Sequence, residues 1–107
     1  MPSLLLKLRA ALKGAADPTK ASSMKAYMKS SMPYHGVPAP EARNVFKEVF
    51  TNLELRSFDI WHLAVLGLWR GARFREERYG ALALAAHKLA RPYQTLDAMP
   101  LYEELVV

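Results

Sequence analysis

The sequence predicts an all-α fold, a helical-repeat solenoid of about six helices in antiparallel pairs. Apolar residues recur at helical spacing in most segments, and almost no segment alternates as a strand would. The prolines stand at the starts of helical segments or directly after their ends, where a helix tolerates them. The 107 residues suffice for one domain, so residues 1–107 are treated as a single α-helical repeat domain.

Two helices are expected in the first third of the chain. Residues 3–15 carry a clean apolar stripe that ends near Gly14. The pair Asp17-Pro18 then places a capping carboxylate before a proline at the first helical position, so a second helix is expected to follow and run to about Ser31. Its expected buried face consists of Met24, Tyr27, Met28 and Ser31.

Two more helices are expected in the middle of the chain. One begins at Pro40, with Glu41 near the positive end of the helix dipole. Ser57 can cap the next helix, which ends at Gly71. The buried stripe of the earlier helix is Phe46, Val49, Phe50 and Leu53, and the later helix carries Trp61 and Trp69, both assigned to packing.

The last third predicts a fifth helix over residues 74–91, apolar almost all round and therefore buried on two sides. A last helix begins after Pro100 and has no glycine, basic residue or polar cap at its end. Because a solenoid needs a polar terminal cap, we expect a fold truncated at its C-terminus. Leu101, Leu105 or Val106 would then be exposed and would favour self-association through this unfinished helix.

The six helices form three consecutive pairs of about 35 residues each. This period is the size of a repeat unit of the HEAT type. The inference depends on the period alone, because no residue-level repeat is visible.

The basic excess lies entirely in the first half of the chain. Residues 1–56 carry nine Lys and Arg against four Asp and Glu, a net charge of +5, whereas residues 57–107 carry six of each kind. Such asymmetry is typical of proteins that bind a polyanion, although surplus lysine on a solvated surface gives the same totals.

Several classes of function are disfavoured by what the sequence lacks. Cysteine is absent, which removes disulfide and thiolate chemistry and fits a reducing, cytoplasmic location. No apolar run is long enough to span a bilayer. His35, His62 and His87 show no metal-ligand spacing, and there is no Gly-rich phosphate-binding loop. We therefore predict no metal, no cofactor and no membrane partner.

The stretch SSMPYHGVPAPEAR, residues 30–43, interrupts the helical pattern and joins the second helix to the third. Gly36 allows a positive φ, and the prolines stiffen the remainder. A stiff loop before a helix N-terminus suits anion binding, because free backbone N–H groups point outward there.

The longer segment AYMKSSMPYHGVPAPEAR resembles the N-terminal signature of the AlkD-type DNA alkylation repair proteins. In that signature Tyr-Met-Lys is followed by an aromatic residue, Gly-Ile/Val and Pro-Glu-x-Arg, and the spacing from Tyr27 to Gly36 and Arg43 agrees without a gap. The segments LWRGARFREERYGALALA and LYEELVV are similar to later parts of the family, so the resemblance covers nearly the whole chain.

The resemblance implies a HEAT-like solenoid that binds alkylated duplex DNA and acts as a DNA glycosylase on N3- and N7-alkylated purines. The family's catalytic carboxylate lies in a Trp-Trp-x-x-x-Asp-like motif after the equivalent of LYEELVV, so no catalytic residue is assigned within residues 1–107. The chain is thus similar to the N-terminal portion only. Ala39 stands where the family often has threonine, which puts one phosphate hydrogen bond in doubt.

The DNA-binding candidates are Arg43, Lys29, Lys47, Tyr27 and Gly36. The resemblance implies that Arg43 contacts the DNA backbone, and its place one turn into the third helix permits a charge-assisted bond to phosphate. The two lysines are read equally well as phosphate contacts or as solvated side chains. Tyr27 falls on the expected buried face, so core packing is favoured over a place on the concave surface.

Two pairs of glutamates, Glu76-Glu77 and Glu103-Glu104, are expected to be solvated helix faces. Three classes of function remain: the N-terminal part of a glycosylase, a non-catalytic helical-repeat DNA-binding module, and a protein-interaction module. The salt dependence of binding distinguishes the DNA-binding module from the protein-interaction module, because backbone-dominated DNA binding weakens steeply with ionic strength.

Overall fold

The computed structural model describes residues 4–28, 32–51 and 53–105, and these form helices without any strand. The all-α prediction is thereby confirmed. The helices are α1 (Leu4–Gly14), α2 (Pro18–Met28), α3 (Ala39–Phe50), α4 (Phe58–Gly71), α5 (Arg75–Ala85) and α6 (Met99–Leu105), with 3-10 segments at η1 (Lys88–Tyr93) and η2 (Leu96–Ala98).

Two of the helices begin at the capping residues that the sequence predicts. The Asp17 carboxylate accepts a hydrogen bond from the backbone N–H of Thr19 at 2.9 Å, and the Ser57 hydroxyl accepts one from Ile60 at 3.2 Å. Each cap satisfies a backbone donor that the first turn of a helix leaves without a partner.

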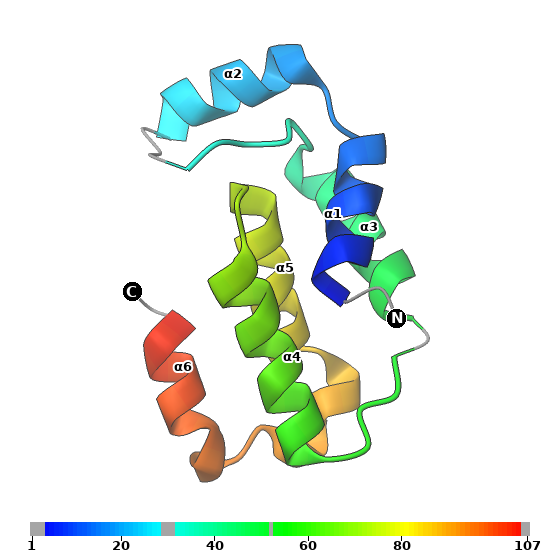
Figure 1. Cartoon of the computed structure of the whole chain (residues 1–107), viewed down its shortest axis with the longest axis vertical. Coiled ribbons are helices and arrows are strands. Elements are labelled where there is room, and N and C mark those ends of the chain that lie inside the picture. The colour runs from blue at the N-terminus through cyan, green and yellow to red at the C-terminus, as the bar shows by residue number, and fades with distance from the viewer. Residues whose placement is uncertain (1–3, 29–31, 52, 106–107) are drawn as a thin grey trace.

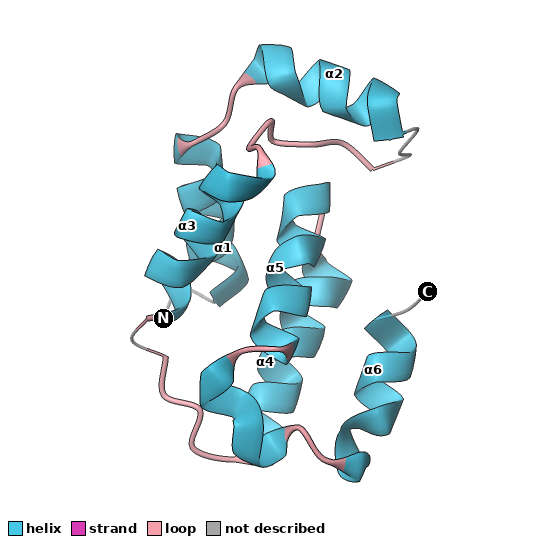
Figure 2. Cartoon of the chain, turned by 180° about the vertical axis from the view of Figure 1, so that it is seen from behind, coloured by secondary structure: helices cyan, strands magenta, loops and turns pink. Residues whose placement is uncertain are grey.

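The helices α4 and α5 lie side by side at the centre, with α1 and α3 together on one flank and α6 on the other (Figure 1). Helix α2 crosses one end of the molecule, and residues 32–38 run beneath it (Figure 2). The closest pairs are therefore α1 with α3 and α4 with α5, not the three consecutive pairs expected from the sequence. The physical reason is the extended connection after α2, which carries α3 back against α1.

The core fills the space on both sides of α5, as the sequence predicts for this helix. Its largest members include Leu8, Leu12, Phe46, Phe50, Trp61, Leu68 and Leu84. The helices approach closely at Gly80, where a Cβ atom would lie 2.6 Å from the Leu8 Cδ2 atom. The Trp61 indole donates to the Leu84 carbonyl at 3.1 Å, which confirms its packing role.

Helix α5 ends at Ala85, earlier than the residue 91 expected from the sequence. The His87 side chain caps the following 3-10 segment by accepting from the Leu89 N–H. The Gln94 amide donates to the carbonyls of Ala85 and His87 at 3.1 and 2.9 Å, so it satisfies acceptors at the end of the helix. The apolar composition of the segment alone could not show that polar side chains end the helix at Ala85.

The last helix begins at Met99, and its two leucines are not exposed as expected. Leu101 and Leu105 are 1% and 7% exposed, because α6 packs back against α4. The rings of Tyr102 and Trp61 also meet there, with centroids 6.4 Å apart. Val106 lies outside the described residues. The prediction of exposed leucines, on which self-association depended, is therefore wrong for both leucines.

Candidate functional site

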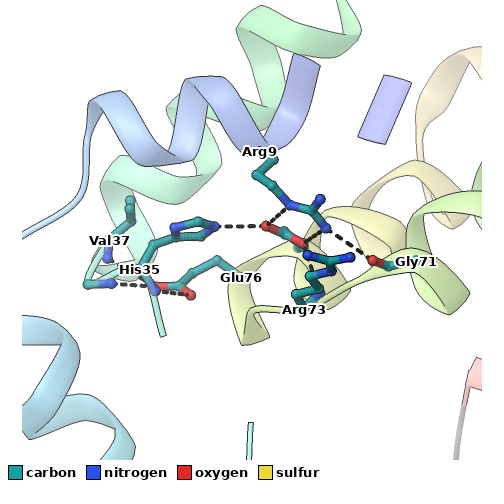
Figure 3. A network of polar contacts seen from close by, with 8 residues as sticks. Arg9, His35, Val37, Gly71, Arg73 and Glu76 are labelled. Carbon is teal, nitrogen blue, oxygen red and sulfur yellow. Dashed lines mark hydrogen bonds and ion pairs between the residues drawn. The ribbon is translucent and has the colours of Figure 1, made fainter. Parts of the chain in front are cut away.

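The loop of residues 32–38 is held from below by a buried carboxylate at the start of α5. Glu76 accepts hydrogen bonds from the backbone N–H groups of His35, Gly36 and Val37, at 2.9, 2.9 and 3.0 Å (Figure 3). Glu76 is 1% exposed, so these bonds lie out of contact with water. The N–H groups of the loop therefore bind a carboxylate of the protein itself, and not the external anion that the sequence suggested.

The neighbouring carboxylate of Glu77 ties the same loop to α1. It accepts from the Arg9 guanidinium at 3.0 and 2.9 Å and from the backbone N–H of Arg73 at 3.0 Å. The His35 imidazole approaches its other side at 2.8 Å and stacks on the Phe74 ring, with centroids 3.8 Å apart. Arg9 also donates to the Gly71 carbonyl at the end of α4 (Figure 3). One carboxylate thus joins three segments that are distant in sequence.

Opposing effects act on the pKa of Glu77. Burial alone would raise the pKa of this carboxyl. The hydrogen bonds from Arg9, the Arg73 backbone and His35, with the charge of Arg9, outweigh burial and hold the pKa below its ordinary value. Glu77 is therefore a charged structural anchor.

Both glutamates were expected on a solvated face, and this expectation is wrong. They occupy the first turn of α5, which the loop and α1 cover. The sequence held one signal for this: α5 was expected to be buried on two sides, so its first turn would also meet neighbours. Nothing in the sequence indicates which backbone groups the Glu76 carboxylate would bind, because those donors lie about 40 residues away along the chain.

Gly36 has a structural role at the turn of this loop. Its φ is +89°, as expected for a glycine in a turn, and a Cβ atom there would lie 2.0 Å from the Asp17 carbonyl oxygen. Its carbonyl accepts from the Asp17 N–H at 3.2 Å, which ties the loop to the start of α2. Since Glu76 takes the loop N–H groups, the free donors that motivated a phosphate contact at Gly36 are not available.

Tyr27 does not belong to the core, contrary to the expectation. Its side chain is 85% exposed and lines a hollow beneath α2 together with Tyr34 and Tyr79. The phenol oxygens of Tyr34 and Tyr79 lie 3.2 Å apart. Burial, and then this hydrogen bond, raises the pKa of Tyr34 to about 12.

Arg43 and Lys47 lie one turn apart on the exposed face of α3. They border a shallow hollow of about 260 Å³, whose floor includes the rings of Phe46, Phe50 and His87. Among the described residues, no ion pair holds either cation. Lys29, the third basic candidate, lies outside the described residues.

Several other cationic side chains are engaged within the protein. Arg9 binds Glu77, and Arg70 binds Glu104 through two hydrogen bonds of 3.0 and 2.7 Å, so Glu104 is paired rather than simply solvated. Arg78 lies over the Trp69 ring at 4.5 Å from the centroid, and the half-buried Trp69 packs against the core. Arg43 and Lys47 are therefore among the exposed cations that remain available to a ligand.

Over the described ranges, no three His, Cys, Asp or Glu side chains gather closely enough to hold a metal ion. No helix in the described part of the chain has both the length and the apolar character needed to cross a membrane.

Residues 8–107 match the model of a protein family described as DNA alkylation repair enzyme. The match covers nearly the whole chain and confirms the resemblance seen in the segment that begins at Ala26. Among curated proteins, none matches the chain.

Proposed function

Since the chain belongs to the DNA alkylation repair enzyme family, we propose that it is the N-terminal, DNA-binding part of a glycosylase that excises N3- and N7-alkylated purines from duplex DNA. In this proposal the helices form the beginning of a HEAT-like solenoid. Arg43 and Lys47 of α3 are assigned to the phosphate backbone, and Tyr27 of α2 is a further contact. Lys29, which lies outside the described residues, is a further basic candidate. Gly36 contributes by shaping the loop between these two helices.

The observation that carries the proposal is a pair of cations on α3, Arg43 and Lys47, that no ion pair holds within the described part of the chain. A guanidinium and an ammonium at positions i and i+4 project from the same face of a helix. Both can approach one strand of a polyanion without first breaking an internal ion pair. A contact of this kind is sequence-independent and sets the register of the protein on DNA.

The excision chemistry is not assigned to residues 1–107. The two glutamates nearest the loop, Glu76 and Glu77, are buried and fully engaged in holding backbone and arginine groups. A general base must reach the water or proton that it acts on, which neither carboxylate can do in this arrangement. We therefore expect this chain to bind DNA without releasing alkylated bases.

The proposal is tested with the purified chain and a fluorescent duplex, unmodified or containing one 7-methylguanine. We expect anisotropy to report binding whose affinity falls with salt, with a logarithmic slope of about −2 or steeper for two or more phosphate contacts. Chromatography of the reaction should show no free 7-methylguanine. Absence of duplex binding at low salt would contradict the DNA-binding assignment, and base release abolished by a substitution within residues 1–107 would contradict the assignment of chemistry elsewhere.

A further inference from the structure

The inner face of α2 has a composition that core packing does not explain. Five residues at three- and four-residue spacing form this face: Thr19, Lys20, Ser23, Met24 and Tyr27. A helix that only covers a core shows an apolar stripe on its inner face. Here the face presents a cation, two hydroxyls, a thioether and a phenol, a mixture typical of a ligand site.

The larger of two hollows under this face is aromatic. Its volume is about 500 Å³, and three tyrosines from three segments line it: Tyr27 from α2, Tyr34 from the loop and Tyr79 from α5. The Arg75 guanidinium lies 5.6 Å from the centroid of the Tyr79 ring. Tyr27, 85% exposed, offers a stacking surface for a flat ligand, whereas the buried Tyr34 and the half-buried Tyr79 contribute to the wall of the hollow.

The second hollow adjoins the first and carries the positive charge. It has a volume of about 400 Å³, shares Ser23 and Met24 with the aromatic hollow, and adds Lys20 and Thr19. No Asp or Glu lines either hollow within the described residues. Because the Asp17 carboxylate occupies the first N–H groups of α2, the Lys20 ammonium is the group that would meet an anion.

One wall of these hollows is pre-formed. Tyr34 and Val37 belong to the loop whose backbone Glu76 holds through three hydrogen bonds. The opposite wall, α2, is joined to that loop by the Asp17–Gly36 backbone bond at its first turn. A fixed aromatic wall reduces the entropy that a ligand must overcome on binding.

We propose that the two hollows form one groove, the α2 groove, which binds one unstacked nucleotide of single-stranded DNA. The base stacks on Tyr27 against the wall to which Tyr34 and Tyr79 contribute, and the adjoining phosphate meets Lys20. The choice of nucleic acid as ligand rests on the proposed function. An apolar peptide side chain would fill the aromatic hollow but would leave Lys20 and the Thr19 hydroxyl without a role. Stacking rings beside a cation are the arrangement by which proteins bind single strands without reading sequence.

Fluorescence anisotropy with labelled oligothymidine, compared with a blunt duplex, tests the groove. The Tyr27→Ala variant should lose about 5- to 100-fold in single-strand affinity, the range expected for one base–aromatic stack. Tyr27→Phe should retain the affinity because the ring remains. Lys20→Ala should lower the logarithmic salt slope by about 0.7, the value for one phosphate contact on a single strand.

Matched controls separate the groove from general effects. Leu96→Ala removes an apolar side chain that is 86% exposed, much like the 85% of Tyr27, but that does not line the groove. Lys88→Ala removes an exposed lysine in η1. Both should bind single strands as the parent chain does, and all variants should melt within a few degrees of it.

The outcomes distinguish this inference from the proposed function. If Tyr27→Ala and Leu96→Ala reduce single-strand affinity equally, the α2 groove is not the binding site. If the parent chain binds the duplex but does not bind oligothymidine, the proposed single-strand site in the α2 groove is wrong, and the proposed function is unaffected. If the chain binds single strands in a Tyr27-dependent way but does not bind the duplex, the α2 groove is supported and the proposed duplex contact is contradicted.

Discussion

The carboxylate of Glu76 and the backbone N–H of Gly36 lie 2.9 Å apart, although 40 residues separate them in the chain. This contact, with its neighbours at His35 and Val37, places a negative charge where three backbone donors converge. The geometry is that of an anion-binding loop whose site is already filled. The loop is thereby a rigid part of the scaffold that presents α3 and Tyr34.

Removal of the Glu76 carboxylate should destabilise the protein strongly. Glu76→Ala leaves three buried N–H groups without an acceptor, and we expect a loss of about 3 kcal/mol or more in the free energy of unfolding. Glu76→Gln keeps one acceptor oxygen and should lose less. Urea denaturation of both variants checks this order. Glu103→Ala, on the exposed side of α6, is the control and should stay within about 0.5 kcal/mol of the parent. If Glu76→Ala were as stable as this control, the three hydrogen bonds from the loop to Glu76 would not stabilise the fold.

Two glycine substitutions should have opposite effects. Gly36→Ala forces a Cβ into contact with the Asp17 carbonyl at a φ of +89°, so it should destabilise by several kcal/mol, above the roughly 1–3 kcal/mol of backbone strain alone. Gly67→Ala, in the interior of α4 with nothing within 4 Å of the new methyl group, should stabilise by about 0.5–1 kcal/mol. Thermal melts of the two variants make the comparison. Equal melting shifts of the same sign would show that the turn at Gly36 relaxes freely.

The lowered pKa of Glu77 predicts a specific loss of stability in acid. A carboxyl whose folded pKa lies below its unfolded value contributes its full stability above the unfolded value, about 4.3, and loses it as the pH falls through the folded pKa. The parent should therefore lose stability progressively below about pH 4.5, and Glu77→Gln should show a shallower decline. Unfolding free energies measured from pH 6 to pH 3 give the slope.

Salt separates this effect from that of Glu104, whose pKa the Arg70 hydrogen bond also lowers. Glu104 sits in an exposed pair that high salt screens, whereas the Arg9–Glu77 pair is largely shielded. The difference in pH dependence of the unfolding free energy between the parent and Glu77→Gln should therefore persist at high ionic strength. If the two proteins share one pH slope under those conditions, Glu77 does not anchor the fold as a charged group.

Local chemistry explains which features could be predicted from the sequence. Asp17 and Ser57 cap helices because a short polar side chain before a helical segment reaches its own first turn. Gly36 adopts a positive φ because the turn requires it. Each of these outcomes depends on residues within a few positions of one another.

Long-range packing explains what the sequence could not reveal. Glu76 and Glu77 are buried because a loop and a helix from elsewhere in the chain cover them. Leu101 and Leu105 are covered because α6 returns to α4, and Tyr27 is exposed because α2 spans a groove instead of a core. Helical spacing shows which residues share a face, but it does not show what that face meets.

The contact proposed for α3 predicts the behaviour of Arg43→Ala on duplex DNA. Loss of one phosphate contact should weaken binding about equally for all base sequences and lower the logarithmic salt slope by about one unit. Lys47→Ala should act similarly, because both cations border the same face of α3. Stability should change little, since both side chains are exposed and hold no ion pair among the described residues. Anisotropy titrations of one duplex at several salt concentrations provide the slopes.

Arg70→Ala is the matched control for this experiment. Arg70 lies on α4 beside α6, on the opposite flank from α3 (Figure 1), and Glu104 already neutralises its charge. Its removal should therefore change duplex binding little, even though the formal charge falls as much as in Arg43→Ala. Equal losses for Arg43→Ala and Arg70→Ala would mean that the net charge of the chain, and not the face of α3, attracts DNA. A loss confined to Arg43→Ala and Lys47→Ala would place the phosphate backbone along α3, because in the described ranges no carboxylate holds either of these cations.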